Sequence, residues 1–142
     1  MTIYNDIRAA FETKLNTEAS LTGFEKAFEN VSYDPTTGVS FLKVVFVPTS
    51  RRSAVRGLNP QQRYQGVFRV FCYAPEGNGP SIADDMANKV MIAFNAATDI
   101  SFTDVDNNTI NVSIDYSERD SGFVDTPWYY TVVNIGWYVY AA

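Results

Sequence analysis

Residues 64–74 constrain the fold more than any other segment because they are apolar on both faces of a predicted strand. The segment is rich in β-branched and aromatic residues and ends at a proline, a pattern typical of a β-strand. Side chains alternate between the two faces of a strand, so Phe68 and Val70 share one face while Val67 and Phe71 share the other. Such a strand must be covered twice, by helices of its own domain on one face and by something else, such as a second subunit, on the other.

A helix is predicted directly after this strand. Prolines and glycines between residues 75 and 80 predict a turn, and Ser81 followed by Asp84 resembles the capping box that starts a helix. Apolar residues then recur at three- and four-residue spacing and form one stripe that can lie on the sheet. The stripe consists of Ile82, Ala83, Met86, Ala87, Val90, Met91 and Phe94. We interpret Asp84 and Asp85 as charges that favour the positive end of the helix dipole, not as a catalytic pair.

A second helix and three further strands follow from the same periodicities. Residues 1–21 carry apolar side chains at helical spacing, with Thr2 as the cap. Strands are predicted at residues 41–47, 109–116 and 128–140. Pro48 closes the first strand, and the second alternates cleanly, with Tyr116 on its inward face. Gly136 in the third strand indicates a bulge or a close backbone approach.

These elements predict a single domain over residues 1–142. The expected fold is α+β, with a mixed, mainly antiparallel β-sheet and two helices packed on one face. Residues 34–38 have the composition of a turn and predict a hairpin bend. Residues 24–33 fit either a helix or a strand.

Composition argues against an enzyme. The chain has no histidine, so imidazole-based triads and most zinc sites are excluded, and its single cysteine, Cys72, is predicted to be an inert thiol in mid-strand. Asp99, Asp104 and Asp106 lack the spacing and the closing glutamate of an EF-hand, so no metal is expected. No signal peptide or membrane-spanning run is recognisable, and the net charge of −5 argues against general nucleic-acid binding.

Residues 49–63 form the most unusual stretch of the sequence. They contain Arg51, Arg52, Arg56 and Arg63, which are four of the chain's 11 basic residues, together with very little apolar content. We expect an exposed loop, because long loops in compact domains are usually functional or disordered. It is either a solvated hairpin loop or a contact loop whose guanidinium groups meet carboxylates or carbonyls of a neighbouring protein.

Aromatic residues make up 15% of the chain, and aromatic side chains are enriched at subunit interfaces. A lone chain of this length is not expected to cover both faces of its apolar strands. Phe71, Trp128 and Trp137 are therefore the candidate interface residues, and the chain is expected to be a homo-oligomer.

Several short motifs, taken in order, resemble one family. They are the helix start at residues 2–8, the strand end at Pro48, the Gln65-Gly66 entry into strand 67–73, the turn at 75–79 with its helix to Phe94, and the Pro127-Trp128 start of the last strand. This order is similar to that of the phage tail terminator-like (tail completion) proteins of long, non-contractile-tailed phages. The resemblance extends over nearly the whole chain.

The resemblance implies a subunit that assembles as a hexameric ring on the completed tail tube, stops tube polymerisation and offers a surface to the head-tail connector. DNA would pass through the ring without specific binding. No catalytic residue and no cofactor are implied, and the expected location is the head-proximal end of the virion tail, after synthesis in the host cytoplasm. A connector or neck protein of the same virion is the alternative within this class, and a small-ligand-binding domain is the alternative of another class.

Overall fold

The fold is an α+β domain built on one mixed sheet, as the sequence predicts. The computed structural model describes residues 2–57 and 61–141. The helices and strands are α1 (Ile3–Thr17), β1 (Glu25–Ala27), β2 (Phe41–Ser53), β3 (Gln62–Pro75), α2 (Ser81–Ala93), β4 (Asp99–Thr103), β5 (Thr109–Arg119), β6 (Phe123–Asp125) and β7 (Trp128–Ala141). The strand order is β1-β2-β3-β7-β5-β4, with β6 also paired to β7. Only the β1–β2 pair is parallel among these strands.

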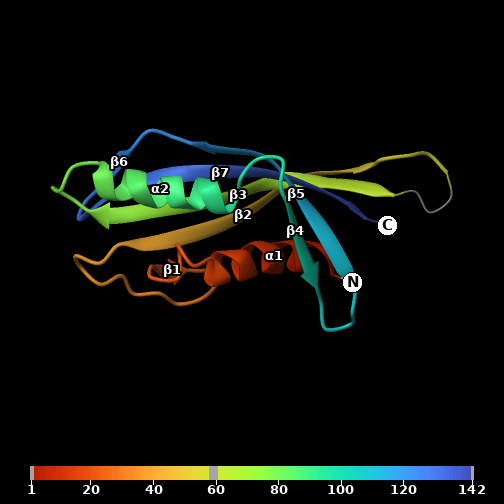
Figure 1. The fold of residues 1–142 in the computed structure, drawn as a ribbon, viewed down its shortest axis with the longest axis horizontal. Helices are drawn as coiled ribbons and strands as arrows, with labels where there is room; N and C mark the ends of the chain where they lie inside the picture. Colours follow the sequence, from red (N-terminus) through yellow and green to blue (C-terminus); the bar gives the residue numbers. More distant parts are fainter. Residues whose placement is uncertain (1, 58–60, 142) are drawn as a thin grey trace.

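β3 lies at the centre of this sheet, between β2 and β7. On its even-numbered face, Phe68, Val70, Cys72 and Ala74 are fully buried. Both helices contribute to the same core cluster as this face, so both cover one side of the sheet. In Figure 1, α2 runs along β3 and β7, while α1 lies next to the β4–β5 hairpin.

The opposite face of β3 is covered by aromatic side chains of the neighbouring strands. Tyr73 stacks on Phe41 of β2, with ring centroids 4.6 Å apart and planes inclined by 3°. Trp128 of β7 meets Phe41 edge-on at 5.1 Å. Lateral packing of aromatic rings thus covers part of a face that we expected to need a second subunit.

The connection between β1 and β2 differs from the prediction. Residues 34–38 do not form a hairpin bend, because β1 pairs with β2 in parallel, with Glu25 opposite Phe41 and Ala27 opposite Lys43. Parallel neighbours need a crossover connection, and residues 28–40 supply it.

Pro48 does not close β2. The strand continues to Ser53 through a bulge between Pro48 and Ser50. Pro48 is tolerated because β1 pairs only with Phe41–Lys43, so beyond that point β2 has no second neighbouring strand among the described residues.

Two further local predictions are wrong. Ser81 does not cap α2, because Pro80 occupies the cap position and no side-chain cap bond forms. Tyr116 does not point inward, because a bulge between Ile114 and Tyr116 reverses the alternation of β5. Its ring instead lies directly over Gly136, so the group that approaches this glycine is a side chain and not the backbone that the sequence predicted.

Candidate interaction surfaces

A long hairpin arm extends from the body of the molecule. The arm is defined as residues 49–63, the distal ends of β2 and β3 and their connection, of which 58–60 lie outside the described residues. Its base is a paired ribbon, since Arg51 pairs with Tyr64 and Arg52 with Arg63, whereas residues 54–57, which include Arg56, lie outside the strands. The predicted loop is therefore shorter than residues 49–63. Figure 1 shows the arm projecting beyond the rest of the sheet.

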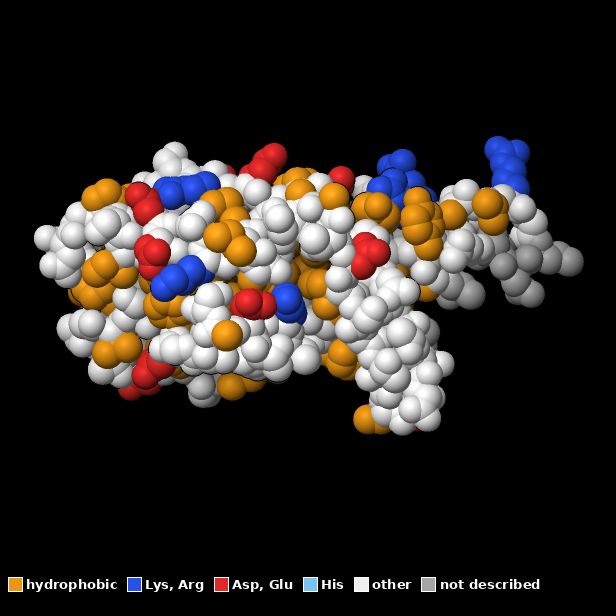
Figure 2. Space-filling view, viewed as in Figure 1, with side chains coloured by type: hydrophobic (Ala, Val, Ile, Leu, Met, Phe, Trp, Pro, Cys, Tyr) orange, Lys and Arg blue, Asp and Glu red, His pale blue; other side chains and the backbone are white. Residues whose placement is uncertain are grey.

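Three of the four arginines of the arm are exposed to solvent. Arg51, Arg52 and Arg56 are exposed, and Arg63 is half-buried. Figure 2 shows basic side chains spaced along the arm. The ion pairs formed within the described residues are Lys14–Glu18, Lys89–Asp85 and Arg119–Asp84, so none of them includes an arm arginine.

Two of these guanidinium groups lie over aromatic rings at the base of the arm. Arg51 lies 5.7 Å from the ring centroid of Tyr64, and Arg63 lies 4.9 Å from that of Tyr138. Each contact is worth about 0.5–1 kcal/mol at an exposed site. The contacts orient the arginines without neutralising them, so their charge remains available to a partner.

The candidate aromatic residues differ in how much surface they offer. Trp137 is 2% exposed and packs in the core, where it stacks on Phe46 at 5.3 Å. Phe68 is also fully buried, so the expectation that a lone chain cannot cover such rings is wrong for both. Trp128 is nearly covered, at 9% exposed, and Phe71 is half-buried.

A groove lies beside this aromatic face, between the 28–35 segment and β2. It has a volume of about 450 Å³, and Tyr73 and Trp128 form part of its wall. Glu29 lines it as well and accepts a hydrogen bond from the backbone N–H of Phe46. This bond occupies one backbone donor of β2 at a point where the strand has no second neighbour.

An acidic pocket lies between the start of α1 and the β4–β5 turn. Its volume is about 290 Å³, and it is lined by Thr2, Asn5, Asp6, Phe102, Thr103, Asp104, Val105 and Asp106. Asp6 is 4% exposed, and its Oδ2 atom has no hydrogen-bond partner. Asp6 is not among the residues predicted from the sequence, although its position four residues before the buried Ala10 places it beside the apolar stripe of α1.

The carboxylate of Asp104 is fixed in this pocket by its own turn. Its Oδ1 accepts hydrogen bonds of 2.9 Å from the backbone N–H groups of Asp106 and Asn108. These bonds, led by that of Asn108, lower the pKa of Asp104. Burial raises the pKa of Asp6, and the hydrogen bond and negative charge of Asp104 raise it further.

The described residues contain neither a reactive thiol nor a cluster of metal ligands. Cys72 is fully buried, and burial raises the pKa of its thiol to about 12, so the nucleophilic thiolate is scarce at neutral pH. Across residues 2–57 and 61–141, no three His, Cys, Asp or Glu side chains are grouped so as to hold a metal ion. None of the helices in this part of the chain is long and apolar enough to cross a membrane.

Comparisons with known proteins agree with this description. A family model described as "Phage tail terminator protein" matches residues 6–137. A solved structure superimposes with a TM-score of 0.70 over 95% of this chain and 94% of its own, at 19% sequence identity, which supports the fold alone. No curated protein matches the sequence.

Proposed function

Since this chain belongs to the phage tail terminator protein family and is therefore a structural protein of the bacteriophage tail, we propose that it caps the completed tail tube as a ring. The ring has six copies, stops tube polymerisation and presents the surface to which the head's connector binds. The protein acts at the head-proximal end of the tail and is not an enzyme. The match over residues 6–137 carries this proposal.

The surface of the chain supports a role in assembly. Phe123 is 48% exposed and lies beside the aromatic face of the sheet, where its ring centroid is 5.5 Å from that of Tyr130. Exposed apolar side chains that adjoin a covered aromatic cluster are suited to burial against another subunit. Phe71 and the edge of Trp128 complete this surface.

The charge distribution supports the passage of DNA without binding. The chain carries a net charge of −5, and the arm holds four of its 11 basic residues. A ring whose lumen is lined by the acidic body repels phosphate, so the duplex slides through it. The arm would then contact the tail tube or an adjacent copy of the chain, not DNA.

A head-tail connector is the alternative within the virion, and electron microscopy separates the two functions. Particles are assembled in a host that carries the phage genome with this gene deleted. Tube polymers longer than those of the wild type indicate a terminator and would establish the proposal. Tails of normal length that lack heads indicate a connector and would overturn it.

A small-ligand-binding domain is the alternative of another class, and the groove of about 450 Å³ beside β2 is the feature that favours it. Mass in solution distinguishes the two, measured by light scattering with and without tail tubes. Rings, either free or formed on tubes, support the terminator. A chain that stays monomeric with tubes and binds a small molecule in this groove contradicts it.

A further inference from the structure

The acidic pocket between α1 and the β4–β5 turn is lined by a buried carboxylate that has one oxygen without a hydrogen-bond partner. A buried carboxylate oxygen without a partner is uncommon, because an unpaired polar atom inside a protein costs free energy. Oδ2 of Asp6 is such an atom. The residues that line the pocket include three carboxylates, those of Asp6, Asp104 and Asp106, and no lysine or arginine.

The carboxyl groups of Asp6 and Asp104 influence each other's affinity for a proton. Asp6 has a raised pKa and Asp104 a lowered one, and each has a hydrogen bond to the other among its causes. The negative charge of Asp104 is among the causes that raise the pKa of Asp6, because two neighbouring carboxylates repel each other. A cation that entered the pocket would relieve this repulsion by pairing with both carboxylates.

The same chain carries cations that lack acidic partners. Arg51, Arg52 and Arg56 are exposed on the arm and take part in none of the ion pairs formed within the described residues. The arm contains four basic residues and no acidic residue, which leaves seven basic and 16 acidic residues elsewhere, a net charge of −9. Body and arm are therefore complementary in charge.

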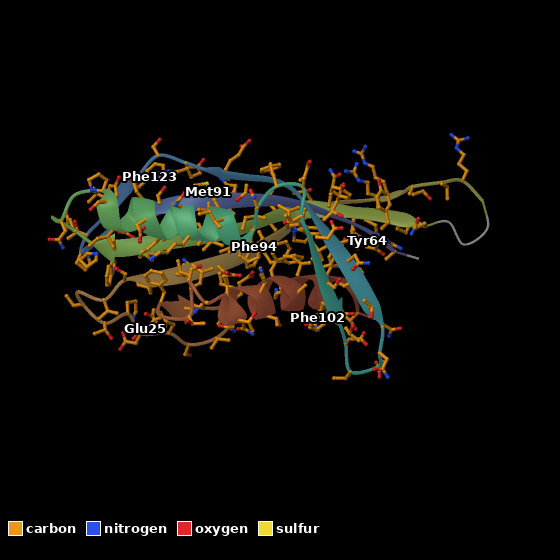
Figure 3. The ribbon with its side chains drawn as sticks, viewed as in Figure 1. Glu25, Tyr64, Met91, Phe94, Phe102 and Phe123 are labelled. Carbon is orange, nitrogen blue, oxygen red and sulfur yellow. The ribbon has the colours of Figure 1, made fainter. Side chains whose placement is uncertain are left out.

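The arm does not reach the pocket of its own chain. Figures 1 and 3 show that the arm, whose base is marked by Tyr64, and the β4–β5 hairpin, marked by Phe102, leave the body in diverging directions. Both features lie at the same end of the molecule. In a ring, neighbouring copies are related by rotation about one axis, so each feature keeps the same height along that axis in every copy. If the axis runs along the molecule, the arm of one copy can therefore meet the pocket of its neighbour.

We propose that the pocket formed by Asp6, Asp104 and Asp106 receives an arginine side chain from the arm of a neighbouring copy of this chain. The inference rests on the proposed function, because it supplies a contact between copies in the ring. A guanidinium group suits the site, since its planar fork can donate to two carboxylates at once. The lack of three carboxylates in a metal-binding arrangement favours this cation over a metal ion.

Cross-linking between two variants, each with one added cysteine, tests the contact. Val55 lies on the arm between Arg52 and Arg56 and is 58% exposed, and Val105 lines the pocket and is 97% exposed. Tagged Val55→Cys and Val105→Cys chains are mixed with tail tubes and treated with a short bis-maleimide. The native Cys72 is fully buried and does not interfere. We expect a covalent dimer of the two variants.

A matched control keeps this experiment decisive. Val39→Cys places the thiol on an exposed valine, 38% exposed, in the crossover connection instead of the pocket. If rings form in which Val55→Cys links to Val39→Cys as well as to Val105→Cys, the inference is overturned. It is also overturned if rings form in which Val55→Cys links to neither. Both outcomes leave the proposed ring intact. If Val55→Cys links only to Val105→Cys, but the phage that lacks this gene has tails of normal length, the contact is supported and the capping function is overturned.

Asp6→Asn supplies an independent measurement on the native cysteine background. We expect it to weaken self-association at least about 10-fold, because an amide does not hold a guanidinium as a carboxylate does. In a variant that already has Arg51, Arg52 and Arg56 replaced with glutamine, Asp6→Asn should weaken self-association no further. Additive losses overturn the inference. A metal-binding pocket would also overturn the inference. It would appear as a rise in the melting temperature of the isolated chain with millimolar Mg²⁺ or Ca²⁺, and Asp6→Asn would abolish that rise.

Discussion

Asp6 and Asp104 face the same pocket, and their pKa values move in opposite directions. A group with a raised pKa in the folded state binds its proton more tightly there than in the unfolded chain. Asp6 therefore favours folding most below the unfolded carboxyl pKa of about 3.9, and this contribution is lost as pH rises through its folded value. Asp104 behaves in the reverse way, because its lowered pKa stabilises the fold above that range.

The first prediction follows for Asp6→Asn in the isolated chain. The neutral amide keeps the shape of the protonated carboxyl group and has no charge to bury, so the variant should gain stability relative to the wild type as pH rises from about 4 to 7. Urea melts of both proteins across this range measure the difference. Curves that stay parallel with pH would contradict it, and Asp115→Asn, at an exposed residue of β5, serves as the control.

A glycine in the sheet yields the second prediction. A Cβ atom at Gly66 would clash with the backbone carbonyl oxygen of Val47 and would lie 2.9 Å from the Cα of Pro48, and neither backbone atom can move aside easily. Gly66→Ala should therefore destabilise the fold by roughly 1–3 kcal/mol, as overpacking does. Gly23→Ala is the control, because its Cβ would have no atom within 4 Å. Equal denaturation midpoints for the two variants would refute this account.

At the scale of elements, α1 is held to the sheet by aromatic stacking. The ring of Phe11 stacks on that of Phe68 at 4.6 Å and also contacts Phe94 and Trp137, at 5.7 and 6.4 Å. One side chain of α1 thus joins β3, β7 and the end of α2.

The third prediction tests this joint. Phe11→Ala should cost about 3–5 kcal/mol of unfolding free energy, because Phe11 is fully buried and its removal leaves a cavity. Ile92→Ala, on the outer face of α2 and 67% exposed, should change stability by less than about 0.5 kcal/mol. Guanidinium melts compare the two variants. A small loss for Phe11→Ala would show that α1 contributes little to the cooperative fold.

The sequence predicted most reliably the elements whose own periodicity determines their packing. α2 is an example, since Ala83, Met86 and Val90 of its stripe are buried as the spacing required. The paired base of the arm was missed because exposed polar residues resemble a loop when only local composition is read. Its strand character comes from pairing with β3, which no local pattern reveals.

The candidate sites show the same limit. The buried Asp6 acquires its importance from Asp104, about 100 residues away in the sequence, and the topology alone brings the two into one pocket. Trp137 was chosen as an interface residue because its strand is apolar on both faces. The structure buries it between Phe46 and Phe11, so pattern alone could not separate core rings from surface rings.

At the scale of the whole molecule, charge is divided between two parts. The arm carries four positive charges and the rest of the chain a net charge of −9. Opposite charges attract neighbouring copies, whereas the net charge of −5 repels them, so assembly depends on where the arm is placed. Because the Debye length shortens as salt rises, this contribution to assembly should weaken with ionic strength.

The fourth prediction removes the charge of the arm. Replacing Arg51, Arg52 and Arg56 with glutamine should leave the melting temperature nearly unchanged, because all three side chains are exposed. Electron microscopy of phage carrying this variant should show tails longer than those of the wild type, since copies that cannot join cannot stop the tube. Replacing Lys14, Arg69 and Lys89 with glutamine removes the same charge outside the arm and should leave tail length normal. If both variants lengthen the tails equally, net charge and not the arm controls assembly; if neither does, the arm has no part in termination.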